Sequence, residues 1–316
     1  MMLPVVQMRD GSLLGMDNRE NHFPDTNRPV DWHSRAARWN AVLRSAAFWV
    51  GFFVCLFLMR ILVGFLGLGQ SAADDTRGQW CGGILMTVLT LALTWICVRM
   101  DTRPVVEQGT RLVRGSIPRA ILGLLCVMPL CALSIVCLRW LIPGVRFVRA
   151  EISILHVVSA MGLYVVLAAY EEIGFRGYPM RRLMRSFGVW PTLLLIAPVF
   201  ALYHIALGWS LFPALIGTGA GSLLFGMAAV AARRGLAFPV GVHAGWNFTT
   251  WSLGVGSAGI FKMTFPADLT QRVQSIGMCA YLACMLFGTL LLWFWSKRRV
   301  FRDSTRIPGE WSANRK

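Results

Sequence analysis

Residues 46–68 read AAFWVGFFVCLFLMRILVGFLGL, with Arg60 as the one charged side chain in the stretch. A helix rises about 1.5 Å per residue, so this run can cross the roughly 30 Å hydrocarbon core of a bilayer. Seven comparable runs follow, at residues 80–98, 120–142, 152–171, 190–207, 211–232, 236–256 and 275–296. The sequence therefore predicts an all-α fold, a polytopic membrane helix bundle of about eight transmembrane helices.

The composition of the 316-residue chain supports a membrane protein and excludes several other classes. Hydrophobic residues make up 56% of the chain and charged residues 15%, whereas soluble domains are about 25% charged. The eight cysteines all fall in the apolar runs, and no two of them form a CxxC pair. They therefore predict neither a zinc ribbon nor a redox motif.

Basic residues predict how the bundle is oriented. The chain carries 31 Lys and Arg residues, and with eight spans the alternate segments hold 24 of them on one side and five on the other. By the positive-inside rule, both termini are then cytosolic. This arrangement also accounts for the net charge of +16. We expect no nucleic-acid partner, because no basic–aromatic stripe accompanies the charge.

Four segments follow from this arrangement. Residues 1–45 form a polar cytosolic tail, and residues 46–150 hold the first transmembrane helices. Residues 152–255 form a core that contains the polar residues described next. Residues 256–316 contain the last transmembrane helix and a basic cytosolic tail.

Few ionisable side chains lie at membrane depth, where each is costly and marks a candidate functional position. Two of the 15 acidic residues, Glu171 and Glu172, stand at the end of the fourth span, and Arg176 follows them. Two of the five histidines, His204 and His243, lie inside the fifth and seventh spans. Arg181, Arg182 and Arg185 are interpreted as interfacial anchors, and Arg60 and Arg139 as residues that snorkel or pair locally.

Helical spacing pairs several of these residues. Side chains four positions apart share a helix face, which places Phe200 beside His204, His243 beside Asn247, and Glu172 beside Arg176. Each pair has a structural interpretation as well: a buried ion pair, an interhelical hydrogen bond, or polar packing. The functional interpretation rests on their co-occurrence in three different spans of one half of the chain.

A carboxylate and a histidine can hold and deprotonate a water molecule, and a second histidine with an amide can donate hydrogen bonds to a developing oxyanion. Together these groups predict hydrolysis of an acyl bond, including a peptide bond. A zinc site formed by Glu171, His204 and His243 is the alternative. We favour a metal-free site, because the two histidines stand on different helices without short ligand spacing.

The three motifs resemble those of a known family. EExxxR at Glu171, FxxxH at Phe200 and HxxxN at His243, in this order on successive helices, are similar to the motifs of the CAAX protease and bacteriocin-processing family, also called CPBP or Abi. The resemblance covers about residues 152–255, and no motif position departs from the family pattern. It implies an intramembrane endopeptidase built from about eight helices.

The resemblance also implies a role for each motif residue. Glu171 and His204 would position the attacking water, and His243 and Asn247 would stabilise the oxyanion. Glu172 and Arg176 would support the site, and Phe200 would shape the wall of the substrate pocket.

The expected substrate is a peptide or lipidated protein in the membrane, either of the CAAX type or a bacteriocin-like peptide to be processed. We expect a multi-pass protein of a bacterial inner membrane. A non-catalytic adaptor or bacteriocin-immunity protein with the same fold is the alternative. A transporter or proton relay is less favoured, because the sequence has no convincing internal repeat.

Overall fold

The computed structural model describes residues 32–68, 76–101, 109–110, 112, 114–232, 235–255 and 259–304. Contacts divide the chain into Met1–Asp31 and Trp32–Lys316, and all described residues belong to the second unit. Most of the predicted tail, residues 1–31, therefore lies outside the described residues. The elements in chain order are α1 Arg35–Phe65, α2 Thr76–Arg99, α3 Ser116–Leu141, β1 Arg146–Arg149, α4 Ile154–Arg176, α5 Tyr178–Phe187, α6 Val189–Ala206, η1 Pro213–Thr218, α7 Gly219–Ala232, α8 Ala237–Ser252, β2 Phe261–Thr264, η2 Ala267–Leu269 and α9 Thr270–Ser304.

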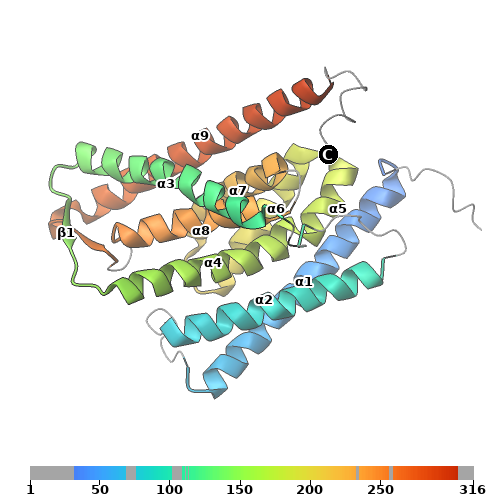
Figure 1. Cartoon of the computed structure of the whole chain (residues 1–316), viewed down its shortest axis with the longest axis horizontal. Coiled ribbons are helices and arrows are strands. Elements are labelled where there is room, and N and C mark those ends of the chain that lie inside the picture. The colour runs from blue at the N-terminus through green and yellow to red at the C-terminus, as the bar shows by residue number, and fades with distance from the viewer. Residues whose placement is uncertain are drawn as a thin grey trace, which may run out of the picture. The chain divides into compact units, whose positions relative to one another are not determined.

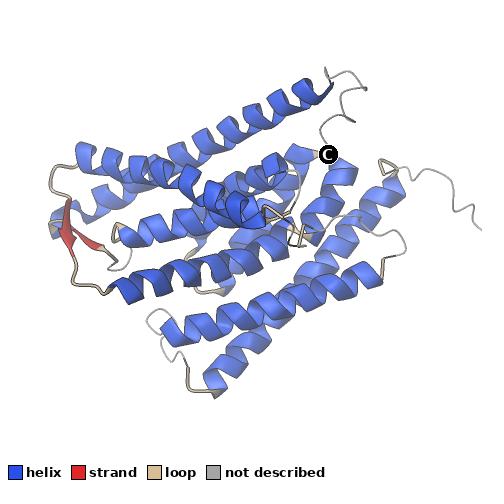
Figure 2. Cartoon of the chain, viewed as in Figure 1, coloured by secondary structure: helices blue, strands red, loops and turns tan. Residues whose placement is uncertain are grey.

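The predicted all-α membrane bundle is confirmed. Figure 2 shows helices throughout the unit, joined by short loops and one small strand pair. In the described part of the chain, seven helical segments are long and apolar enough to cross a membrane. The remaining predicted span, residues 236–256, corresponds to α8, whose 16 residues extend about 24 Å. This short helix packs against α3, α4 and α7, so protein rather than lipid surrounds much of it.

The helices alternate in direction across the bundle. The start of α1 and the end of α9 lie at the same end, on the right of Figure 1. At the other end, β1 and β2 form an antiparallel pair in which Arg146 lies opposite Thr264 and Arg149 opposite Phe261. The sequence analysis did not anticipate this pair, because four-residue strands leave too short a pattern to recognise. It ties the α3–α4 connection to the α8–α9 connection.

Helix α1 begins eleven residues before the first predicted span. The side chain of Ser34 accepts a hydrogen bond from the backbone N–H of Ala37 at 3.2 Å and caps the helix. The segment that precedes the apolar run is thus an extension of the transmembrane helix, and the polar tail ends near Ser34.

Helices α3 and α8 approach each other most closely where glycines face the partner backbone. A Cβ atom on Gly241 would lie 1.9 Å from the carbonyl oxygen of Ala120, and one on Gly245 would lie 2.9 Å from that of Leu124. Small residues at such spacing let two helix backbones come together. Because α8 carries His243, this contact also fixes the height and rotation of a candidate site residue.

A network around Asp101 fixes the α1, α2 and α5 helices to one another. This buried carboxylate, just after α2, accepts hydrogen bonds from Arg44 of α1 and from Arg182 and Tyr178 of α5, the last at 3.1 Å. Arg182 also donates to Asn40 at 2.6 Å. The interpretation of Arg182 as an interfacial anchor was wrong, since it is buried and pairs with a carboxylate distant in sequence.

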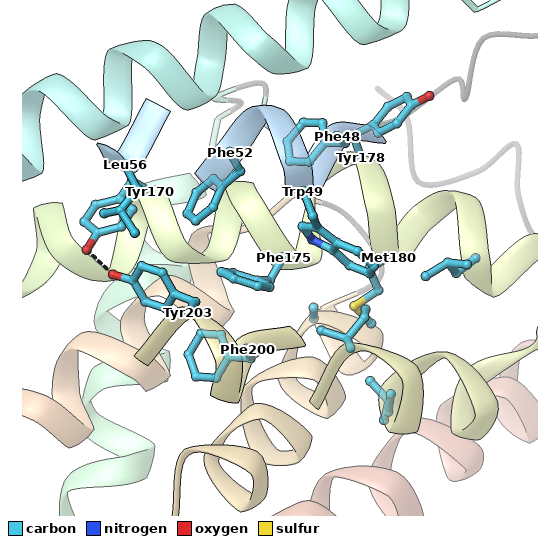
Figure 3. Packing of buried hydrophobic residues seen from close by; sticks show 14 of the residues in the cluster. Phe48, Trp49, Phe52, Leu56, Tyr170, Phe175, Tyr178, Met180, Phe200 and Tyr203 are labelled. Atoms are coloured by element: carbon cyan, nitrogen blue, oxygen red, sulfur yellow. Dashed lines mark hydrogen bonds between the residues drawn. The ribbon is translucent and has the colours of Figure 1, made fainter. Parts of the chain in front are cut away.

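An aromatic cluster joins α1 to the helices that carry the motifs, as Figure 3 shows. The ring of Phe48 stacks on Tyr178 with centroids 5.5 Å apart, and the ring of Phe52 lies 5.3 Å from Phe175 and 5.7 Å from Tyr203. Burial of such large side chains contributes strongly to packing. The first transmembrane helix thereby forms one wall behind the candidate site.

Candidate active site

Four helices bring the predicted polar residues together. The last two turns of α4 carry Glu171, Glu172 and Arg176. His204 stands near the end of α6, and His243 lies in the second turn of α8. Helix α7 packs against both α6 and α8 and also contributes to the cluster. Glu171, Glu172, Arg176 and His243 are all buried, and His204 is half-buried.

Glu172 is the centre of a buried ion-pair network. Its Oε1 atom accepts a hydrogen bond from Nη1 of Arg176 at 3.2 Å, which confirms the pairing expected from their spacing. The same oxygen accepts from Nδ1 of His243 on α8 at 2.9 Å. One carboxylate therefore both neutralises the arginine and orients the histidine ring.

Arg176 is fully buried and held on two further sides. Its Nη2 atom donates to the carbonyl oxygen and the hydroxyl of Ser222 on α7, at 3.2 Å and 3.1 Å. The guanidinium carbon lies 4.5 Å from the ring centroid of Phe200 and 5.7 Å from that of Phe225. Cation–π contacts of this kind strengthen when water is excluded.

Phe225 and Ser222 are site residues that the sequence analysis missed. The ring of Phe225 stacks on His243 with centroids 4.0 Å apart and an interplanar angle of 15°. Ser222 and Phe225 belong to α7, a helix rich in Gly and Ala that carries no ionisable side chain. No spacing pattern marks a serine or a phenylalanine in such a helix, so only the tertiary structure identifies them.

Glu171 faces His243 with one oxygen and a tyrosine with the other. Its Oε2 atom lies 3.6 Å from Nε2 of His243 and has no hydrogen-bond partner among the described residues, although it is buried. Its Oε1 atom accepts from the hydroxyl of Tyr203 at 3.3 Å. A buried carboxylate oxygen without a partner is unusual and suggests a role in binding a further polar group.

The environment of His204 defines which of its nitrogens carries a proton. Its Nδ1 atom lies 2.9 Å from the carbonyl oxygen of Phe200, one turn earlier in α6. A carbonyl only accepts hydrogen bonds, so Nδ1 is the protonated nitrogen and Nε2 keeps its lone pair. Phe200 also contacts the ring, with centroids 4.6 Å apart. The same Phe200 ring lies 6.3 Å from the ring of His243.

The end of α6 that carries His204 is held by an arginine from α1. Nη1 of Arg60 donates to the carbonyl oxygen of Ala206 at 2.7 Å. A cation at a helix C-terminus satisfies a free carbonyl and is favoured by the helix dipole. Arg60 was predicted to snorkel or pair locally, and its observed partner instead lies on another helix, 146 positions along the chain.

Asn247 lies one turn beyond His243 on α8 and is half-buried. In the described part of the chain its side chain makes no hydrogen bond. Its assignment to the oxyanion pair therefore stays a prediction.

No three His, Cys, Asp or Glu side chains are grouped as metal ligands within the described residues. In the predicted zinc alternative, the Nε2 atoms of His204 and His243 would be the available ligand atoms, because Phe200 and Glu172 engage the Nδ1 atoms. The observed geometry instead leaves an acceptor nitrogen and a carboxylate oxygen free to contact water.

A comparison with protein families identifies the segment that contains this cluster. Residues 153–249, slightly less than a third of the chain, match the family described as type II CAAX prenyl endopeptidase Rce1-like. This confirms the resemblance to the CAAX protease family. All seven predicted site residues fall within the match. No curated protein matches the chain.

The family match and the fold together support a membrane-embedded peptide hydrolase. The family is one of proteases, which supports a peptide hydrolase. Seven helices capable of crossing a membrane, found among the described residues, support an integral, multi-pass membrane protein. The cluster of carboxylates and histidines lies within the helical segment that the match covers.

Proposed function

We propose that the protein is an intramembrane endopeptidase that hydrolyses a peptide bond of a prenylated CAAX-type substrate. One observation carries this proposal above the others. Within a segment that matches CAAX prenyl endopeptidases, Glu171 presents a buried oxygen without a partner 3.6 Å from Nε2 of His243. An oriented carboxylate in a water-poor site is the group that activation of a water molecule requires.

The reaction proceeds in two proton transfers. A water molecule held between Glu171 and Nε2 of His204 attacks the carbonyl carbon, and its proton passes to Oε2 of Glu171. The carbonyl oxygen becomes an oxyanion, which accepts hydrogen bonds from His243 and Asn247. Glu171 then returns the proton to the leaving nitrogen, and the C–N bond breaks to give a carboxylic acid and an amine.

Glu172 and Arg176 support this reaction without touching the substrate. When protonated on both nitrogens, His243 donates from Nδ1 to Glu172 and from Nε2 to the oxyanion. The bond from Nδ1 to Glu172 at 2.9 Å and the stacked ring of Phe225 hold the imidazole in place. Such preorganised donors need no rearrangement when charge develops, which is the main source of their catalytic effect.

We favour a metal-free reaction for a reason specific to these residues. Glu171 and His204 already supply a proton acceptor and a hydrogen-bond acceptor for water, so the step needs no Lewis acid. Metal analysis of the purified protein, together with cleavage in the presence of a chelator, tests this. Activity unchanged at a metal content far below one ion per chain is expected, and chelator-sensitive activity with stoichiometric zinc would overturn it.

We place the cleavage near the cytosolic side of a bacterial inner membrane. Glu171 stands five residues before the end of α4, which leads into the arginine-containing helix α5. Arginines mark the cytosolic side by the positive-inside rule.

The decisive experiment compares matched carboxylate variants on one substrate. The protein is reconstituted in lipid nanodiscs and given a fluorescence-quenched peptide that ends in a farnesylated Cys-aliphatic-aliphatic-X sequence, beside the same peptide with a free cysteine. We expect Glu171→Gln to lower kcat by at least about 100-fold. Glu151→Gln, at an exposed carboxylate, serves as the control and should leave kcat unchanged.

Two outcomes would reject the proposal. Glu171→Gln with wild-type kcat would remove the carboxylate from its role as base. A folded wild-type protein that cleaves neither peptide, yet binds the farnesylated one, would favour the non-catalytic adaptor.

A further inference from the structure

Two tyrosines that no motif includes connect the proposed base to its neighbouring helix. Tyr170 immediately precedes Glu171 on α4, and Tyr203 immediately precedes His204 on α6. Their hydroxyl groups are hydrogen-bonded to each other, as the dashed line in Figure 3 marks. The pair thus links the two helices that carry the proposed water-binding residues.

The direction of the two hydrogen bonds follows from the acceptor, the carboxylate of Glu171. The hydroxyl of Tyr203 lies 3.3 Å from Oε1 of Glu171, and a carboxylate oxygen only accepts. Tyr203 therefore donates to Glu171, and its own oxygen accepts the proton of Tyr170. Tyr170 thus orients the hydroxyl of Tyr203.

The surroundings make this arrangement rigid. Tyr203 is fully buried and Tyr170 nearly so. The rings of Phe52, Phe175 and Phe200 lie 5.7 to 6.1 Å from that of Tyr203. In such an apolar environment a hydroxyl that loses its partner is costly, so each donor keeps its assigned acceptor.

The two oxygens of Glu171 are thereby made unequal. Oε1 is engaged by Tyr203, while Oε2 is buried without a partner and lies beside His243. Rotation of the carboxylate would break the bond to Tyr203 and leave that hydroxyl without its acceptor.

We propose that Tyr203, oriented by Tyr170, is a positioning residue that fixes the Glu171 carboxylate so that Oε2 faces the attacking water. The inference rests on the proposed function, in which Glu171 is the base. It adds that the base depends on a hydrogen-bond chain across α4 and α6. Neither tyrosine touches the reacting atoms.

The test measures kcat and KM separately on the farnesylated peptide in nanodiscs. Tyr203→Phe preserves the ring and removes only the hydroxyl, so we expect kcat to fall about 10- to 100-fold, the effect of losing a hydrogen bond to a charged group. KM should stay within about twofold, because substrate contacts are unchanged. Tyr170→Phe should produce a smaller fall, since Tyr203 keeps its bond to Glu171.

The double variant separates positioning from general packing. If Tyr170 acts only through Tyr203, Tyr170→Phe together with Tyr203→Phe should be no slower than Tyr203→Phe alone. Tyr281→Phe is the matched control, because the hydroxyl of this half-buried tyrosine donates to the carbonyl of Gly217 at 2.8 Å, outside the site. Its kcat should equal that of the wild type.

Three results would overturn the inference: wild-type kcat in Tyr203→Phe, a double variant that shows the product of the two single losses, or an equal loss in Tyr281→Phe. If Tyr203→Phe does not fold, an unchanged kcat in Tyr170→Phe overturns it. Glu171→Gln, assayed in parallel, keeps the two proposals apart. An active Glu171→Gln removes the proposed base itself, whereas an inactive Glu171→Gln with a fully active Tyr203→Phe removes only the positioning role.

Discussion

The buried pair of Glu172 and Arg176 supports a prediction in which stability and activity respond differently. Both side chains are fully buried, with Nη1 of Arg176 3.2 Å from Oε1 of Glu172. Arg176→Met leaves this carboxylate with His243 as its one hydrogen-bond partner among the described residues. Glu172→Gln leaves the guanidinium without its counter-charge. Removal of one member of a buried ion pair costs about 3–5 kcal/mol, because the other charge remains desolvated.

The double variant Glu172→Gln with Arg176→Met removes both charges at once. Independent effects would lower the free energy of unfolding by about 6–10 kcal/mol, the sum of two such losses. We expect instead a loss close to that of one single variant, and therefore a coupling energy of about 3–5 kcal/mol. Activity should be absent in the two variants that carry Glu172→Gln, because His243 then loses the carboxylate that orients its ring.

The assay is equilibrium unfolding of the reconstituted protein in bicelles by steric trapping, with peptide cleavage measured on the same preparations. Arg139→Met, at an exposed arginine within α3, is the control for the substitution itself and should change stability by less than about 0.5 kcal/mol. The reasoning would be refuted if the loss of the double variant equalled the sum of the two single-variant losses to within about 0.5 kcal/mol. A double variant that regains activity would refute the role assigned to Glu172.

Three further predictions concern the scaffold. Gly241→Ala should push α8 away from α3, since its Cβ would lie 1.9 Å from a backbone carbonyl oxygen. It should therefore lower both the unfolding temperature and kcat. Gly219→Ala, whose Cβ would have nothing within 4 Å, should change neither. Asp101→Asn should destabilise the protein by about 3 kcal/mol, because it leaves two arginines without their carboxylate; a thermal unfolding curve matching that of Glu151→Gln would contradict this. A reporter that is active only in the cytosol should be active when fused after Lys316, and an inactive, stably expressed fusion would reverse the predicted orientation.

Local patterns in the sequence predicted much of the fold and part of the site. Apolar runs of bilayer length identify membrane helices because every backbone polar group must be satisfied within the segment. Spacing of four residues correctly paired Glu172 with Arg176 and Phe200 with His204. Both relations lie within one helix, where geometry follows directly from sequence separation.

Residue spacing could not predict side-chain contacts between different helices. The contacts of Ser222 with Arg176 and of Tyr203 with Glu171 join residues 46 and 32 positions apart. Nothing in the periodicity of either helix indicates which face meets which partner. The interpretation of Arg182 failed for the same reason, since its counter-charge, Asp101, lies 81 positions earlier in the chain.

The proposed reacting groups, Glu171, His204 and His243, are all held in place in the same way. Each has two polar atoms and uses one of them for anchoring: Nδ1 of His204 on a carbonyl, Nδ1 of His243 on a carboxylate, and Oε1 of Glu171 on a hydroxyl. The other atom is left for water or substrate. In a low-dielectric interior this anchoring hydrogen bond is strong, and rotation of the side chain would break it before another hydrogen bond could form. A site built in this way does not depend on the substrate to order its side chains, so binding energy from the membrane-bound peptide remains available for placing the scissile bond.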